Sequence, residues 1–151
     1  MEPHEADRTL LARLALRIVE AEGPIHVDEV ARRIATSFGR DRAGSRIFSA
    51  TKTALNHARG ISPDLVTEDF FWFTRRQLEC PPVRDRTSEE GATLKASSIS
   101  LQEIKAALKI AREDNAGGDE ADLIRSAARL LGYRRVGSEL QARLAQGIES
   151  P

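Results

Sequence analysis

The segment from Arg42 to Asn56 constrains the fold of this chain most, because its residues divide into two faces at helical spacing. At about 100° per residue, one arc collects mostly apolar side chains: Ile47, Phe48, Thr51, Ala54, Leu55 and Ala58. The opposite arc collects small, polar and basic side chains: Arg46, Ser49, Lys52, Thr53 and Asn56. The pattern predicts a helix that packs one face on a core and presents the other outward.

Two further helices are predicted ahead of this segment. Apolar residues recur at helical spacing from Thr9, and Gly23 and Pro24 end that helix, because Gly suits a helix end and Pro does not continue a helix. After a short extended piece at residues 25–26, the helical period resumes over residues 27–37. Gly39 is placed to close this second helix in the left-handed conformation, and a short turn at residues 40–44 leads into the third.

Two β-prone runs follow the third helix, which we expect the run Gly60-Ile-Ser-Pro63 to break. They cover residues 65–67 and 70–74 and are separated by the turn-forming pair Glu68-Asp69, so they predict a β-hairpin. Strand alternation would place Phe70 on the same face as Trp72, and we expect most of this aromatic run to pack in the core. Three helices and a hairpin in this order are typical of a winged helix-turn-helix, which we predict for residues 8–76.

The remainder of the chain predicts a linker and a three-helix unit. Polar residues and prolines dominate from residue 75 to 96, so we expect a linker or surface loop at residues 77–97. Ser100 and Glu103 have the spacing of a helix capping box, and Ile99 and Ile104 flank it as a hydrophobic staple. Residues 115–118 would end this helix. The fold class is therefore mainly α with a small β-hairpin: a winged helix-turn-helix followed by a three-helix unit at residues 98–149.

The two halves of the chain share a turn pattern. Asp119 is placed to cap the fifth helix and Gly132 to end it, and the sixth begins at Ser138. Aligning residues 38–45 with 131–138 pairs Gly39 with Gly132, Arg42 with Arg135, Gly44 with Gly137, and Ser45 with Ser138. Two interpretations stay open: an internal duplication, which makes the C-terminal unit a degenerate second helix-turn-helix, and convergence on one turn geometry. The second copy has no room for a wing, so the first is the better candidate for binding DNA.

The net charge is zero, yet positive charge gathers around the third predicted helix. Between residues 32 and 59, Asp41 is the single acid among seven basic residues: Arg32, Arg33, Arg40, Arg42, Arg46, Lys52 and Arg59. We expect duplex DNA as the partner, with the outward arc of the helix, Arg46, Ser49, Lys52, Thr53 and Asn56, in a groove. Phosphate contacts are expected from Arg32, Arg40, Arg42 and Arg75. Arg134 and Arg135 are placed to extend this strip, whereas Glu68 and Asp69 argue against a wing tip on DNA.

No pattern in the sequence indicates an enzyme. Cys80 is a single cysteine, and His4, His26 and His57 are scattered without ligand spacing, so we expect no metal, no cofactor and no catalytic residue. A phosphate-binding loop ending in Gly-Lys-Ser or Gly-Lys-Thr does not occur. The acidic N-terminal residues precede no long apolar run, which favours a cytoplasmic protein without a membrane partner.

Four stretches of the chain form a further pattern: Glu22-Gly-Pro-Ile-His-Val-Asp-Glu-Val-Ala-Arg-Arg-Ile34, Gly44-Ser-Arg-Ile47, Val83-Arg-Asp-Arg86 and Ala127-Ala-Arg-Leu-Leu-Gly-Tyr-Arg-Arg-Val-Gly137. They resemble an uncharacterised, winged-helix-like domain at the carboxyl end of large bacterial superfamily 1 helicase-like proteins. Such proteins often carry a restriction-endonuclease-like nuclease segment just ahead of this domain. The resemblance implies a non-catalytic accessory module of a DNA-processing protein, with helicase or nuclease domains as further partners. The alternatives are a protein-interaction or dimerisation module and a stand-alone winged-helix transcriptional regulator.

Overall fold

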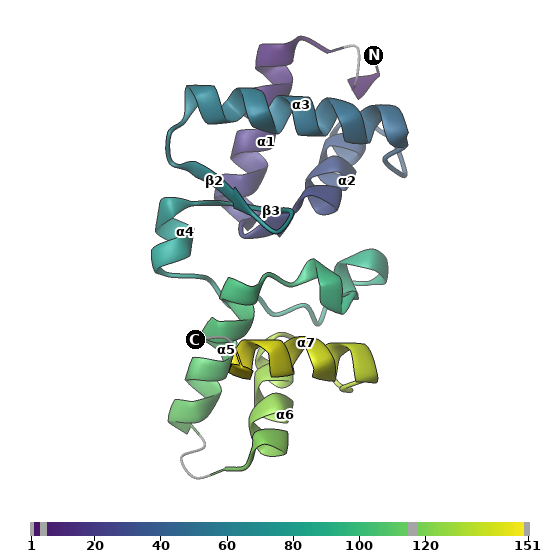
Figure 1. Ribbon diagram of the computed structural model, residues 1–151. Coiled ribbons are helices and arrows are strands. Elements are labelled where there is room, and N and C mark those ends of the chain that lie inside the picture. Colours follow the sequence, from purple (N-terminus) through teal and green to yellow (C-terminus); the bar gives the residue numbers. More distant parts are fainter. Residues whose placement is uncertain (1, 4–5, 115–117, 150–151) are drawn as a thin grey trace. The chain divides into compact units, whose positions relative to one another are not determined.

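A computed structural model describes residues 2–3, 6–114 and 118–149 of the chain (Figure 1). This part is mainly α-helical, as the sequence predicts, and the predicted hairpin belongs to a small three-stranded antiparallel sheet. The chain divides into two compact units, Met1–Cys80 and Pro81–Pro151, which are described separately. His4 and residues 115–117, with which we expect the fourth predicted helix to end, lie outside the described residues.

The first unit contains three helices, a short strand, a hairpin and a fourth short helix. Its elements are α1 (Arg8–Glu22), β1 (Ile25–His26), α2 (Val27–Ser37), α3 (Ser45–Ile61), β2 (Leu65–Glu68), β3 (Phe71–Thr74) and α4 (Arg75–Glu79). The strand order is β1-β3-β2, so β3 is the central strand. Trp72 of β3 pairs with Ile25 of β1 on one side and with Thr67 of β2 on the other. The extended piece predicted at residues 25–26 is therefore β1, which adds a strand to the predicted hairpin. This order of elements is compatible with a winged helix-turn-helix.

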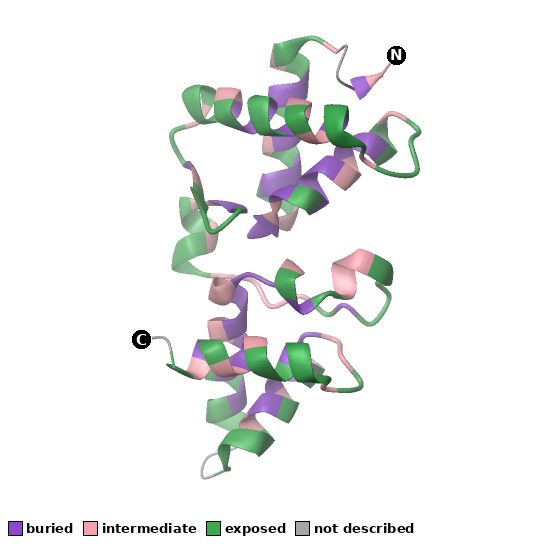
Figure 2. Cartoon of the chain, turned by 45° about the vertical axis from the view of Figure 1, so that its right-hand side comes forward, coloured by how far each residue is buried: buried purple, intermediate pink, exposed green. Residues whose placement is uncertain are grey.

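The core of the first unit lies among α1, α2 and α3. Val19, Val30 and Leu55 are fully buried, and Ile34 is 1% exposed. These residues recur at helical spacing, so each helix buries one apolar stripe and keeps its polar side in solvent. Figure 2 shows this division along α3, whose outward side is exposed.

The connection between α2 and α3 is a tight turn. Gly39 has φ +77°, and the N–H groups of Gly39 and Arg40 donate to the carbonyls of Thr36 and Ala35 at 3.0 and 2.8 Å. These two hydrogen bonds close the last turn of α2, and the left-handed conformation of residue 39 favours glycine. The predicted end of α2 is thus confirmed.

Helix α3 ends within the predicted break at residues 60–63. Gly60 lies inside the helix, which continues to Ile61 and stops where Ser62 turns to an extended conformation (φ −124°, ψ 108°). Glycine lowers helix propensity without breaking a helix, whereas Pro63 disfavours the helical conformation of the residue before it. The proline, and not the glycine, therefore sets the end.

The hairpin tip also differs from the prediction. Asp69 and Phe70 both have positive φ, 51° and 69°, so the two-residue turn is Asp69-Phe70 and not Glu68-Asp69. A turn of this kind matches the twist of the flanking strands. Phe70 consequently leaves the strand and is 73% exposed, whereas Phe71, Trp72 and Phe73 are all buried. The expected face shared by Phe70 and Trp72 does not form.

Helix α4 lies where a loop was predicted. Thr74 and Gln77 form a reciprocal capping box at its start. The Gln77 side-chain amide also donates to the backbone carbonyls of Val19 and Glu20 at 2.8 and 3.1 Å. These carbonyls belong to the last turn of α1, where the Val19 carbonyl also accepts from the Gly23 N–H at 2.7 Å. One glutamine therefore ties the end of the hairpin to the end of α1.

The second unit packs three helices around its own core. It contains the 3-10 helices η2 (Gly91–Leu94) and η3 (Ala96–Ser98), and α5 (Leu101–Asp114), α6 (Glu120–Leu130) and α7 (Ser138–Glu149). Ile99 and Ile104, the predicted staple, are fully buried in that core with Leu131 and Leu144. The Glu103 N–H donates to the Ser100 hydroxyl at 3.1 Å, as a capping box requires.

The carboxylate of Glu103 has a role that the capping pattern did not predict. It is fully buried and accepts two hydrogen bonds from the Arg86 guanidinium, at 2.6 and 2.7 Å, and one from the Arg84 N–H at 2.9 Å. Burial alone would lower the pKa of Arg86, but the hydrogen bonds and the negative charge of Glu103 raise it above its ordinary value. The segment before α5 is thus held to the helix by a buried ion pair.

The two units repeat one helical arrangement at a constant shift. Helices α1 and α5 begin at residues 8 and 101, α2 and α6 end at residues 37 and 130, and α3 and α7 begin at residues 45 and 138. Each difference (101 minus 8, 130 minus 37, 138 minus 45) is 93 residues. Gly132, the counterpart of Gly39, has φ +92°, and the N–H groups of Gly132 and Tyr133 donate to the carbonyls of Arg129 and Ala128. The turn geometry expected in both halves is confirmed.

Buried positions follow the same shift. The matched core pairs are Leu11 and Ile104, Ala15 and Leu108, Ile34 and Ala127, Ala35 and Ala128, and Ile47 and Leu140. An ion pair is repeated as well, since Glu29 with Arg32 corresponds to Asp122 with Arg125. The C-terminal unit therefore repeats the helices of the first unit, and after α7 no hairpin follows within the described residues.

Candidate nucleic-acid interface

The outward side of α3 is the surface on which the predicted groove-binding residues lie. All five, Arg46, Ser49, Lys52, Thr53 and Asn56, are exposed. Thr51, which the sequence placed on the inward arc, is fully buried, and its hydroxyl donates to the Ile47 carbonyl at 2.8 Å. We define these five exposed residues as the α3 ridge.

Two cations of α3, Lys52 on the ridge and Arg59 beyond it, each lie over an aromatic ring. The Lys52 ammonium lies 5.3 Å from the centre of the Phe48 ring, and the Arg59 guanidinium lies 5.8 Å from that of Trp72. Both contacts leave the charged group at the surface, because Lys52 and Arg59 are exposed residues. A cation over a ring face keeps its charge available while its side chain loses freedom.

The four arginines predicted to contact phosphate are in different situations. Arg32 is ion-paired with Glu29, and Arg40 is ion-paired with Glu2. Arg75 is exposed at the start of α4, with its Nε 3.9 Å from the Asp64 carboxylate. Arg42 lies exposed in the turn before α3 and has no ion-pair partner among the residues that the structure describes.

Counting charges along the sequence overestimated the free positive charge between residues 32 and 59. The neutralising acids Glu2, Glu22 and Glu29 lie outside the interval from residue 32 to 59. Glu22 accepts from the Arg33 Nε at 3.0 and 3.2 Å, so a third arginine of the interval is paired. Of these contacts, only the spacing of Glu29 to Arg32 and Arg33 on one helix could have been recognised beforehand. Of the seven cations between residues 32 and 59, the four without a carboxylate partner among the described residues are Arg42, Arg46, Lys52 and Arg59.

His26 has a structural role in the first unit. His26 caps α2, where its Nδ1 accepts from the Asp28 N–H at 3.1 Å, and its ring packs against Phe70 and Phe71. Within the described residues, no group of three or more His, Cys, Asp or Glu side chains is arranged to hold a metal ion. No helix of that part of the chain has both the length and the apolarity needed to cross a lipid bilayer.

Comparison with known proteins gives one match. A family model described as a protein of unknown function (DUF3320) matches residues 1–49, about a third of the chain. The matched segment includes α1, β1, α2 and the turn, and it ends within the first residues of α3. Comparisons with curated proteins and with solved structures gave no significant match.

Proposed function

We propose that the first unit binds duplex DNA, with the α3 ridge in a groove and the turn before it against the sugar-phosphate backbone. The observation that carries this proposal is the exposure of all five ridge residues on the side of α3 opposite its buried stripe. Arg and Asn side chains form paired hydrogen bonds with base edges, and short Ser and Thr side chains permit close approach of the helix.

The paired arginines change the expected phosphate contacts. Arg32 and Arg40 already bind carboxylates, so their use on DNA would require breaking those pairs. Arg42, Arg46, Lys52 and Arg59 are exposed and have no acidic partner in the described chain. We therefore assign backbone contact to the turn and to the cationic members of α3, about four phosphates in all.

The ridge suits nucleic acid better than a protein partner. Stable protein interfaces are anchored by large apolar or aromatic side chains near their centre. Among the exposed large apolar residues, Ile61 alone lies on α3, at its last position. The ridge itself offers charge and hydrogen bonding without such an anchor.

The resemblance to the end domain of helicase-like proteins supports a role as a non-catalytic accessory module of a DNA-processing protein. In that role the unit would hold DNA while motor and nuclease domains perform the chemistry. A protein-interaction module and a stand-alone regulator remain the rival functions, and the experiment below separates the first of them from DNA binding.

The test is fluorescence anisotropy of the full chain with a short labelled duplex. Arg46→Glu with Lys52→Glu should weaken binding at least about tenfold, because two contacts become repulsive. The matched control is Lys109→Glu with Arg112→Glu, which makes the same charge change on the exposed side of α5 in the second unit. Equal affinity in the ridge variant and the control would contradict the proposal, and so would a wild-type protein that does not bind.

A further inference from the structure

The tip of the β2-β3 hairpin exposes an aromatic ring. Phe70 is 73% exposed, more than any other large apolar residue of the described chain. Its φ of +69° lies in the left-handed region, which a bulky side chain rarely adopts and glycine adopts freely. Neither burial nor backbone preference therefore explains a phenylalanine at this position of the free molecule, whereas a ring that enters a partner would explain it.

The ring is held in position by its surroundings. The Val27 N–H donates to the Phe70 carbonyl at 2.9 Å, and the Thr67 hydroxyl donates to the Phe71 carbonyl at 2.8 Å. The His26 ring stacks on Phe70 with 6.1 Å between the ring centroids and 30° between the ring planes. A side chain that is already positioned loses little freedom on binding, so Phe70 is suited to anchor a contact.

The tip is acidic as well as aromatic. Glu68 and Asp69 precede Phe70 in the chain, and both are exposed. Asp28, also exposed, lies beside the His26 ring, to which its backbone N–H donates at 3.1 Å. Carboxylates around an exposed ring repel the phosphate backbone of nucleic acid and attract a cationic surface. The tip therefore fits an apolar hollow that has positive charge at its rim.

A hollow of about 370 Å³ with these properties lies in the first unit, between the start of α1 and the middle of α3. The described residues that line it are mostly small and apolar: Ala6, Arg8, Leu11, Ala50, Thr53 and Ala54. An apolar cavity of about 150 Å³ holds a benzene molecule, so this hollow has room for a phenyl ring. Arg8 is exposed and has no ion-pair partner among the described residues, and Arg46 lies about one helical turn before Ala50.

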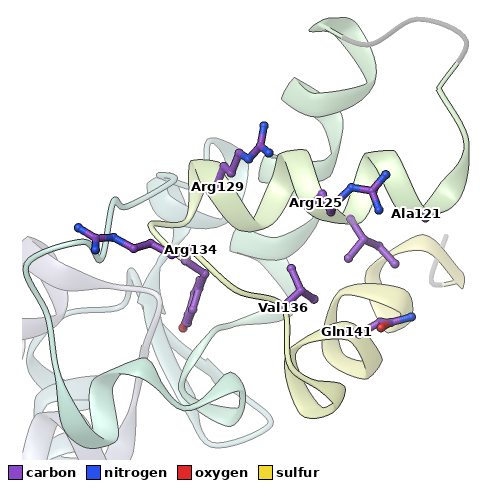
Figure 3. A pocket seen from close by; sticks show the side chains of 8 residues that line it. Ala121, Arg125, Arg129, Arg134, Val136 and Gln141 are labelled. Carbon is purple, nitrogen blue, oxygen red and sulfur yellow. The ribbon is translucent and has the colours of Figure 1, made fainter.

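The second unit also contains a hollow, of about 310 Å³, at the turn between α6 and α7. Figure 3 shows that the Arg129 and Arg134 side chains point away from this hollow and from each other. Arg125, the third arginine beside it, is ion-paired with Asp122. None of these three arginines is both unpaired and directed at an occupant, so the hollow of the first unit is the better match for an acidic tip.

From these observations we infer that two copies of the chain associate, with Phe70 of one copy in the α1-α3 hollow of the other and with Glu68 and Asp69 near Arg8. A ring cannot enter the hollow of its own unit, because the two sites lie at opposite ends of α1. The hollow is lined by the first turn of α1, whereas the tip is bound to Val27, beyond the last turn (Figure 1). About 20 Å of helix separates them.

This association goes beyond the DNA binding proposed for the first unit and does not depend on it. Thr53 lines the hollow and also belongs to the α3 ridge. A second copy docked in the hollow would therefore cover one edge of the ridge. The association is tested without DNA, so its failure would leave the proposal for the ridge untouched.

The test is sedimentation velocity of the full chain at increasing concentration. The average mass of the wild type should rise above that of a single chain and fall again as salt is added, because charge contributes to the contact. Phe70→Gly removes the ring but keeps the turn, and Ala50→Leu fills the hollow from a partly exposed position. Each should weaken association at least about tenfold. The matched control is Leu78→Ala, which removes another exposed apolar side chain of the first unit and should associate like the wild type.

Mixing the two variants gives the sharpest result. The Phe70→Gly protein retains an intact hollow and the Ala50→Leu protein an intact ring, so together they should form a complex of two chains although neither associates alone. Recovery in the mixture would also show that both variants are folded.

Three results would overturn the inference. The first is a wild type that sediments as a single chain up to about 1 mM, the weakest association of interest. The second is association that survives Phe70→Gly. The third is a mixture of the two variants that stays as separate chains, since the ring and the hollow would then not be partners.

Discussion

Gly39 and Gly132 occupy equivalent turns, yet alanine should have very different effects at the two positions. Both have left-handed φ angles, +77° and +92°, which an L-residue adopts at a cost of about 1–2 kcal/mol. A Cβ at Gly39 would meet nothing within 4 Å. A Cβ at Gly132 would overlap the backbone nitrogen of Arg86 and lie 2.6 Å from both the Asp85 Oδ1 and the Thr87 nitrogen.

The additional cost at Gly132 follows from these contacts. The segment at residues 85–87 would have to withdraw, and the hydrogen bond from the Arg86 N–H to the Leu131 carbonyl, now 3.0 Å, would break. Overpacking costs about 1–3 kcal/mol and the lost hydrogen bond about 1 kcal/mol. We therefore expect Gly39→Ala to lower the free energy of unfolding by about 1–2 kcal/mol and Gly132→Ala by about 3–6 kcal/mol.

The assay is urea unfolding of the full chain labelled with 5-fluorotryptophan and 3-fluorotyrosine. Trp72 and Tyr133 are the single tryptophan and tyrosine, so their ¹⁹F signals report the unfolding of the first and the second unit separately. The Gly39→Ala loss should be seen in the Trp72 transition and the Gly132→Ala loss in the Tyr133 transition, each as a lower midpoint at unchanged slope. Equal losses in the two variants, or a larger loss for Gly39→Ala, would refute the close approach of the 85–87 segment to Gly132.

Three other substitutions test contacts that the sequence did not reveal. Glu103→Gln should destabilise the second unit by about 3–5 kcal/mol in urea unfolding, because it leaves the Arg86 guanidinium buried without a carboxylate. Arg86→Met combined with Glu103→Leu should cost much less, and a double variant as unstable as the single one would contradict this reasoning. Phe70→Gly should raise the stability of the first unit by about 1 kcal/mol in thermal unfolding, because glycine accepts a positive φ and the Phe70 side chain is 73% exposed. A loss of stability would show instead that the ring makes a stabilising contact. Gln77→Ala should lower stability by about 1 kcal/mol and speed hydrogen exchange in the last turn of α1, whereas unchanged exchange would mean that Gln77 does not hold that turn.

The fold could be predicted where local chemistry decides it. The left-handed glycines at 39 and 132 and the staple of Ile99 and Ile104 depend on residues that are neighbours in the chain. Their geometry follows from backbone sterics and short-range burial, so helix boundaries near them were predicted correctly.

The features that were missed depend on residues distant in sequence. Arg40 is neutralised by Glu2, and Arg33 by Glu22 across the gap between α1 and α2. Gln77 binds carbonyls 57 and 58 residues away. The helical period places a charge on a face but does not say which acid will reach it, so the cationic cluster around α3 was overestimated. The hairpin tip moved by one residue because Phe70 adopts a positive φ, a conformation that its residue type disfavours.

The salt dependence of duplex binding tests the DNA-binding proposal most directly. With about four phosphates contacted by Arg42, Arg46, Lys52 and Arg59, the slope of log affinity against log salt for the first-unit site should be about −3 to −4. Adding Arg46→Glu and Lys52→Glu should reduce its magnitude by about two. Binding that is insensitive to salt, or a slope unchanged by these two substitutions, would contradict the assignment of the α3 ridge as a DNA-binding surface.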